Sequence, residues 1–152
     1  MRVLSLDLGD KSIGLAVSDL SQTVAQGIGQ MRWSKSTLNE SIDQIRKLLS
    51  QHKVKKIVVG LPKNMKGEEG WQAKKVRSFV RDLSARINIP IILFDERLST
   101  AAAERVLKEA KVSFSKRKKV RDKVAATVIL QNYLDSQKYL KDNPLNSSLS
   151  QE

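Results

Sequence analysis

The chain has 152 residues, and its 28 lysines and arginines exceed its 16 acidic residues by 12 charges. It has no cysteine, which excludes disulfides and zinc–thiolate sites. No apolar run approaches the length of a membrane span, so the sequence predicts a cytoplasmic protein without a membrane partner. The positive charge favours an anionic partner, and nucleic acid is the commonest one. The length predicts a single domain over residues 1–138, followed by a loose tail over 139–152.

The first part of the chain has the patterns of three strands joined by short connections. Residues 3–7 form an apolar run typical of a central strand, and residues 12–18 alternate as a strand does. A third strand is expected over 24–33, where Gly27 and Gly29 weaken the pattern. The short connections predict an antiparallel meander.

Helices and strands then alternate. Thr37 and Glu40 match a capping box before a first amphipathic helix. Apolar stripes predict helices over 38–49, 73–87 and 103–110 and from near Asp122 to near Gln137, and short apolar runs predict buried strands over 55–60 and 91–94. We therefore expect an α/β fold with a mixed five-stranded sheet flanked by helices. Its first three strands would be antiparallel and the remainder parallel, joined by right-handed crossovers.

Three carboxylates stand at the ends of predicted elements that could direct them into one cleft. Asp7 closes the first strand, Glu96 follows the strand 91–94, and Asp122 opens the last helix. Asp122 also falls on the apolar stripe of its helix, where an ionised group is costly unless it is paired or bound to metal. Taken singly, each acid also has a purely structural explanation: Asp7 as a turn residue, Glu96 as the partner of Arg97 in an ion pair at the strand end, and Asp122 as a helix N-terminal acid.

Together, the three acids could hold two divalent cations about 4 Å apart, which would activate a water and stabilise the leaving oxygen of a phosphodiester. Oxygen ligands favour Mg²⁺ or Mn²⁺ over zinc. The single histidine, His52, lies among polar residues and is expected on the surface.

Residues 116–123 carry six basic side chains, and we expect them to form a mobile segment that clamps a phosphate backbone. A solvated connector between helices is the alternative. The residues expected to contact nucleic acid are Lys11, Lys63, Arg97, Lys116, Arg117, Lys118, Lys119, Arg121 and Lys123. Three further lysines are expected to extend this basic surface, namely Lys66, Lys74 and Lys75.

Four motifs occur together in one order: residues 7–19, residues 57–62 followed by Gly67, residues 95–100 and residues 122–126. With these motifs the chain resembles the YqgF/RuvX family over residues 1–135. The resemblance implies a ribonuclease-H-like fold with Asp7, Glu96 and Asp122 as metal-binding catalytic acids. The family is regarded as a nuclease that processes the 5′ end of the 16S ribosomal RNA precursor, and some members are described as resolvases of four-way DNA junctions. Ser12 stands where the family usually has arginine, which removes one phosphate contact.

The leading hypothesis is therefore a divalent-metal-dependent endonuclease, a hydrolase that acts on structured or precursor RNA in ribosome biogenesis. A Holliday junction resolvase is the alternative within catalysis, and it would need two active sites and hence a dimer. A non-catalytic RNA-binding factor would explain the charge but not the three acids. A nucleotide-dependent phosphotransferase would need two domains of this kind. The sequence leaves the choice between RNA and DNA, and the oligomeric state, open.

Overall fold

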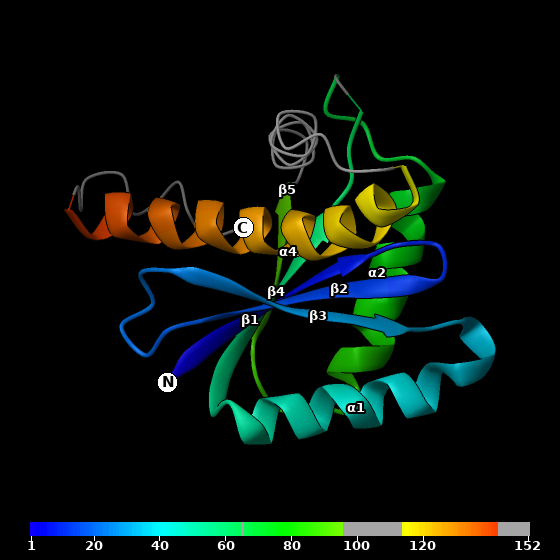
Figure 1. Ribbon diagram of the computed structural model, residues 1–152, viewed down its shortest axis with the longest axis horizontal. Coiled ribbons are helices and arrows are strands. Elements are labelled where there is room, and N and C mark those ends of the chain that lie inside the picture. Colours follow the sequence, from blue (N-terminus) through cyan, green and yellow to red (C-terminus); the bar gives the residue numbers. More distant parts are fainter. Residues whose placement is uncertain (65, 96–113, 143–152) are drawn as a thin grey trace.

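The computed structural model describes residues 1–64, 66–95 and 114–142, and for 114–123, 139, 141 and 142 it describes the backbone alone. Its five strands form one sheet in the order β3-β2-β1-β4-β5 (Figure 1). The strands are β1 (Arg2–Leu8), β2 (Ser12–Ser18), β3 (Ala25–Arg32), β4 (Val54–Leu61) and β5 (Ile91–Asp95). The helices are the 3-10 helix η1 (Lys35–Thr37), α1 (Leu38–Gln51), α2 (Trp71–Ser84) and α4 (Phe114–Asp142). The predicted helix over 103–110 lies outside the described residues.

The first three strands form the predicted antiparallel meander, and β1, β4 and β5 run parallel. The pairing of β2 with β3 shifts register between Leu15 and Ala16, which lie opposite Gly29 and Gly27. Gly29 has a φ of 130°, a conformation that side chains strongly disfavour. The glycines therefore accommodate an irregularity within β3 and do not interrupt the strand.

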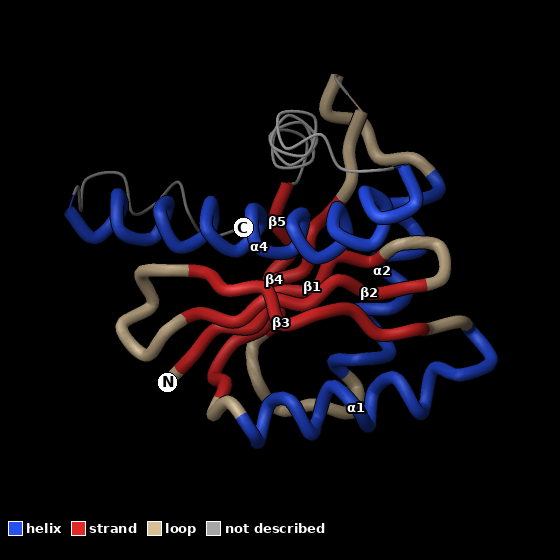
Figure 2. Tube along the Cα trace, in the orientation of Figure 1, coloured by secondary structure: helices blue, strands red, loops and turns tan. Residues whose placement is uncertain are grey.

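The helices form two layers, one on each face of the sheet (Figures 1 and 2). On one face, α1 and α2 cover the larger core, which includes Leu4, Leu6, Ile57 and Val59. On the other face, α4 crosses β1, β2 and β3 and covers a smaller core of eight buried residues, namely Val3, Ala16, Val58, Ala126, Ile129, Leu130, Tyr133 and Leu134. Alternate residues of β1 thus enter different cores, as the strand period requires.

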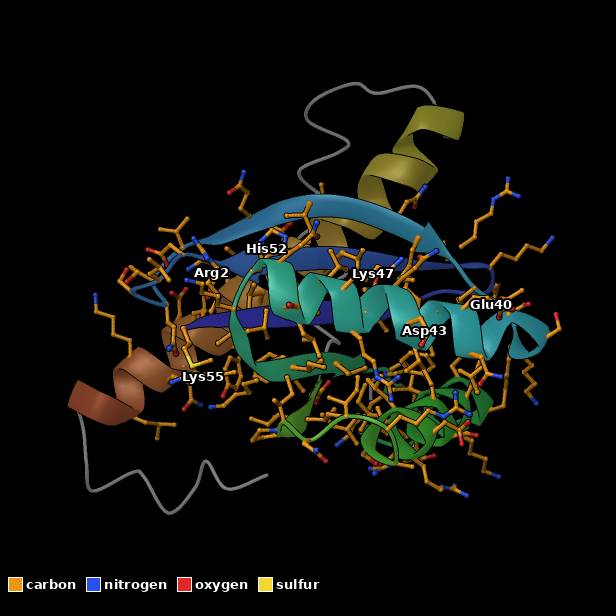
Figure 3. The ribbon with its side chains drawn as sticks, turned by 90° about the horizontal axis from the view of Figure 1, so that it is seen from below. Arg2, Glu40, Asp43, Lys47, His52 and Lys55 are labelled. Carbon is orange, nitrogen blue, oxygen red and sulfur yellow. The ribbon has the colours of Figure 1, made fainter. Side chains whose placement is uncertain are left out.

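The start of α1 differs from the prediction. The capping box pairs Ser34 with Thr37 instead of Thr37 with Glu40. The Ser34 amide donates to the Thr37 hydroxyl at 2.9 Å, and η1 then leads into α1. Figure 3 shows α1 across the sheet, with Glu40 near its start and His52 after its end. His52 is half-buried, and its carbonyl accepts a hydrogen bond from Arg2 at 3.2 Å.

The predicted apolar stripes of α1 and α2 pack against the larger core. Phe79 is a further residue of the buried face of α2. Ile87 is buried as its place on the predicted stripe requires, but the predicted helix end is wrong, because α2 ends at Ser84. The expectation that β5 is fully buried is wrong, because each of its residues is half-buried. In the described sheet β5 pairs only with β4, so one of its edges lacks a strand neighbour.

The predicted bounds of the last helix are also wrong. α4 has 29 residues and begins at Phe114, well before Asp122. Lysine and arginine are good helix formers, and this propensity outweighs the mutual repulsion that suggested a mobile segment over 116–123. At its other end α4 continues to Asp142, four residues into the predicted tail. Among the described helices, none combines the length and apolar character needed to cross a bilayer.

Candidate functional site

Asp7 is the next-to-last residue of β1 and lies on the face of the sheet that α4 covers. Strand alternation places Val3, Ser5 and Asp7 on this face, and Val3 belongs to the core beneath α4. Asp7 is half-buried and takes part in an interaction within the structure. The sequence prediction of an acid at the end of a central strand is confirmed.

The two strands beside Asp7 present glycines on this face. Gly14 of β2 lies directly opposite Asp7. On the other side, Leu6 pairs with Val59, so the next residue of β4 beside Asp7 is Gly60. Neither neighbour contributes a side chain next to the carboxylate. The strands β2 and β4 therefore place no side chain beside Asp7 on this face.

A buried hydrogen bond fixes the position of α4 along β1. The Ser5 hydroxyl donates to the Ala126 carbonyl at 2.8 Å, and both residues are fully buried. Further along α4, the Tyr133 hydroxyl accepts a hydrogen bond from Lys56 at 3.0 Å, and Lys56 pairs with Val3. The helix α4 therefore runs in the direction opposite to β1: Tyr133 lies near the level of Val3, and Ala126 lies at the level of Ser5.

The same alignment of α4 with β1 applies to Asp7 and Asp122, two of the acids predicted from the sequence. Asp7 lies two residues beyond Ser5, about 7 Å along the strand. Asp122 lies four residues before Ala126, about 6 Å along the helix and on the same helical face. The backbone of the Asp122 turn is thus brought to the level of Asp7. The Asp122 side chain is outside the described atoms, so its role stays a prediction.

The third acid, Glu96, lies outside the described residues, as does Arg97. The strand before it is described: β5 ends at Asp95, which pairs with Leu61 at the end of β4. The strands β1, β4 and β5 are parallel, so their C-terminal ends lie at the same edge of the sheet. Asp7 is at this end of β1, and Glu96 follows this end of β5. In the part of the chain that the structure describes, no three histidine, aspartate or glutamate side chains form a group able to hold a metal ion.

The turn after β1 is fixed by residues that the sequence did not identify as important to the site. The Gly9 carbonyl accepts hydrogen bonds from the Trp33 indole at 3.0 Å and from the Lys75 ammonium at 3.2 Å. Lys75 also lies 3.6 Å from an Asp10 carboxylate oxygen and 5.2 Å from the Trp33 ring centroid. A Cβ atom on Gly9 would lie 3.1 Å from the Ser12 carbonyl, so the turn is tightly closed. Lys75, predicted only as part of a basic surface, thus anchors this turn to α2.

The predicted phosphate contacts are spread over three segments. Lys11 is exposed in the turn after β1, and Lys63 is half-buried in the loop between β4 and α2. Figure 2 shows this loop projecting beyond the sheet. The basic residues of 116–123 occupy the first turns of α4, and their side chains are outside the described atoms. Positive residues therefore come from the segments that follow β1 and β4 and from the start of the helix that contains Asp122.

Beside Lys63, an ion pair orders the end of the same loop. Arg77 donates to both carboxylate oxygens of Glu69, at 2.6 and 2.8 Å. These hydrogen bonds lower the pKa of Glu69, and Lys63 lowers it further through its charge. They also raise the pKa of Arg77. The pair attaches the loop to α2 through Glu69, two residues before that helix begins.

Comparison with known proteins identifies the family. The model of the RuvX family, described as "Holliday junction resolvase", matches residues 1–136. A Thermoanaerobacter pseudethanolicus protein named "Putative pre-16S rRNA nuclease" is 52% identical over 139 residues, covering 91% of this chain and 99% of the relative. Proteins of the same name from Oceanobacillus iheyensis and Listeria monocytogenes are 46% and 45% identical, over 89% and 90% of this chain and 98% and 99% of theirs.

Solved structures agree on the fold. Thermus thermophilus RuvC superposes with a TM-score of 0.55 at 11% identity, over 91% of this chain and 97% of that one. The fowlpox virus Holliday junction resolvase gives a TM-score of 0.54 at 17% identity, over 90% of this chain and 99% of that one. These likenesses establish a RuvC-like, ribonuclease-H-like arrangement of the strands and helices. The sequence match over most of the chain shows that this protein belongs to the RuvX family.

Proposed function

We propose that this protein is a divalent-metal-dependent endonuclease that hydrolyses phosphodiester bonds, with Asp7, Glu96 and Asp122 as its catalytic acids. The observation that carries the proposal is the register set by the Ser5–Ala126 hydrogen bond, which aligns the end of β1 with the Asp122 turn of α4. β5, the strand before Glu96, ends at the same edge of the sheet. Elements that are distant in sequence thus converge where the acids are required.

The donor set fits Mg²⁺ or Mn²⁺. The acids supply oxygen atoms, the chain has no cysteine, and its single histidine lies at the end of α1 beside the start of β1, the opposite end of that strand from Asp7. A divalent cation bound by the three acids would lower the pKa of a water and stabilise the charge of the leaving oxygen.

The protein's own residues would bind and orient the strand. Lys11, Lys63 and the basic turns of α4 over 116–123 would contact phosphates, which position a nucleic acid without reading its sequence. Gly14 and Gly60 would allow the scissile phosphate to approach Asp7 closely. Without a bound cation, three convergent acids would repel phosphate, and this argues against a purely RNA-binding role.

For the substrate, we propose the 5′ region of precursor 16S ribosomal RNA, a step of ribosome biogenesis in the cytoplasm. The support is the name carried by relatives that are 45–52% identical over about nine-tenths of this chain. Branched DNA is the second candidate, and it is favoured by the description of the family model. A resolvase would need two active sites acting together, and hence a stable dimer.

The test compares two labelled substrates, precursor 16S ribosomal RNA and a four-way DNA junction, each incubated with Mg²⁺ or Mn²⁺. Asp7→Asn should abolish cleavage because it removes a carboxylate donor. In chelator this variant should bind the substrate at least as tightly as the wild type, because a negative charge has been removed.

Asp43→Asn is the matched control. Asp43 lies on α1, on the opposite face of the sheet (Figure 3), and its surface ion pair with Arg46 at 3.5 Å contributes little stability. This variant should cleave like the wild type. Unchanged cleavage by the Asp7 variant would refute the assigned site. Cleavage of the junction alone would refute the RNA substrate while leaving the nuclease in place.

A further inference from the structure

A pocket of about 670 Å³ lies on the face of the sheet opposite α4, between the end of β3 and the two helices of that face. The described residues that line it include Trp33, Lys35, Trp71, Lys74, Lys75 and Asp82. Asp7, the one acid of the three whose side chain is described, does not belong to it. The pocket combines aromatic rings with positive charge, and these are the two components of surfaces that bind single-stranded nucleic acid.

The two tryptophans of the pocket differ in exposure. Trp71, the first residue of α2, is 67% exposed, whereas Trp33 is only 6% exposed. Trp33 is fixed by its hydrogen bond to the Gly9 carbonyl and by an edge-to-face contact with Phe79, whose ring centroid is 5.4 Å away. Trp33 therefore forms a rigid wall, and Trp71 presents a large apolar ring to solvent. Such a ring is available for stacking.

The charges around the pocket favour an anionic occupant. Lys35 and Lys74 are exposed, and Lys75 is partly exposed between the pocket and the turn after β1. Asp82 is the one acid among the described lining residues. Lys75 already lies 3.6 Å from an Asp10 carboxylate oxygen, so Lys35 and Lys74 supply the charge that is available to an occupant. This charge favours an anionic chain over an apolar peptide. The exposed ring of Trp71 favours a nucleic acid over an acidic peptide, because every nucleobase offers a face that can stack on it.

We propose that this pocket binds an unpaired nucleotide of the substrate, with its base stacked on Trp71 and the adjoining phosphates contacted by Lys35 and Lys74. The inference rests on the proposed nuclease function and adds a requirement for a single-stranded flank. The Gly9 carbonyl connects the two regions, since the turn that it belongs to follows Asp7 and is held by Trp33 and Lys75. A strand passing over this turn would reach both the pocket and the β1 end.

A single-stranded flank is the expected ligand because a duplex conceals the faces of its bases. Only an unpaired base can insert beside an indole ring, and this stacking depends little on base identity. The pocket would therefore hold the substrate beside the cleavage point without selecting a sequence.

The experiment measures binding of a fluorescein-labelled 12-nucleotide oligouridylate by fluorescence anisotropy in chelator, so that cleavage does not interfere. Trp71→Ala should weaken binding about 5- to 150-fold, the range expected for the loss of one stacked base. Trp71→Phe should retain most of the affinity because it keeps an aromatic face. Leu20→Ala is the matched control, since Leu20 is an apolar residue of similar exposure, 60%, in the β2–β3 connection.

A second readout separates stacking from a general loss of structure. The chain has two tryptophans, so the oligonucleotide should quench the intrinsic fluorescence of the wild type and of Leu20→Ala but much less that of Trp71→Phe. The double variant Lys35→Ala/Lys74→Ala should reduce the slope of log affinity against log salt by about 1.4, which corresponds to two phosphate contacts on a single strand. The exposed Lys47 on α1 supplies the charge control, Lys47→Ala.

The proposed binding role of the pocket would be overturned if Trp71→Ala bound the oligouridylate as tightly as the wild type. It would also be overturned if Trp71→Ala lost as much affinity for a blunt duplex as for the oligouridylate. Neither result would affect cleavage of precursor RNA by the wild type, so the nuclease proposal would survive. Conversely, a wild type that binds the oligouridylate through Trp71 but cleaves no nucleic acid would overturn the nuclease proposal alone.

Discussion

The hydrogen bond between Ser5 and Ala126 allows a quantitative test of how the candidate site is assembled. Ser5→Ala removes the donor, and it leaves the Ala126 carbonyl with only its intrahelical partner. A buried hydrogen bond of this kind contributes about 1 kcal/mol to the free energy of unfolding. For a chain of this size, that loss lowers Tm by about 2–4 °C.

The same substitution should affect activity more than stability. If the unfolding free energy is of the usual 5–15 kcal/mol, losing about 1 kcal/mol leaves essentially every molecule folded. The hydrogen bond sets the register between α4 and β1, however, so the Asp122 turn becomes less precisely placed. If the whole of this loss of about 1 kcal/mol raises the activation free energy of cleavage, because the acids are misaligned, the cleavage rate falls about fivefold.

The assay combines urea denaturation with single-turnover cleavage by Ser5→Ala. Ser84→Ala is the control, because the Ser84 hydroxyl is exposed and donates only to the Arg81 carbonyl in its own helix. The control should leave cleavage unchanged. Wild-type cleavage by Ser5→Ala, with an unfolding free energy that falls as expected, would refute the claim that this bond positions the acids.

Three further predictions follow from other contacts. Lys75→Met should lower the unfolding free energy by about 1–2 kcal/mol, because the Gly9 carbonyl loses a charged donor. Urea denaturation measures this, with Lys47→Met as the control. Identical denaturation curves for the two variants would contradict the prediction. The Ser21 hydroxyl and main-chain amides lower the pKa of Asp19 to about 2, so its stabilising contribution is present above pH 4 and is lost as pH falls toward 2. Asp19→Asn should therefore flatten the stability profile between pH 4 and 2 in urea titrations, and an unchanged profile would exclude this source. Affinity for nucleic acid should fall about a hundredfold or more between about 50 and 200 mM salt, and a flat response in anisotropy would rule out the phosphate contacts.

The sequence predicted the elements of the fold well because their patterns are local. The apolar run before Asp7 and the stripe around Ile42 require a buried strand and a half-buried helix. The predictions failed where two local signals competed. Before α1 the sequence offers two capping boxes, Ser34 with Thr37 and Thr37 with Glu40, and the structure uses the first. The basic segment over 116–123 has both charge repulsion and high helix propensity, and it is helical.

The candidate site could be predicted only in part. Asp7 was identifiable as an acid at a strand end, but its flanking glycines required knowledge of which strands pair. Gly14 and Gly60 are 46 residues apart, at positions 14 and 60, and become neighbours of Asp7 only through the sheet order. The anchoring of Gly9 by Lys75 is likewise a tertiary contact with no sequence signature. The placement of Glu96 and of the Asp122 side chain stays a prediction.

The position of α4 has a consequence for synthesis of the protein. This helix follows the five described strands, yet it covers Val3 and Ala16 near the beginning of the chain and contributes the Asp122 turn. A nascent chain therefore exposes one apolar face of its sheet until α4 has left the ribosome, and the end of β1 and the backbone of the Asp122 turn come together only then.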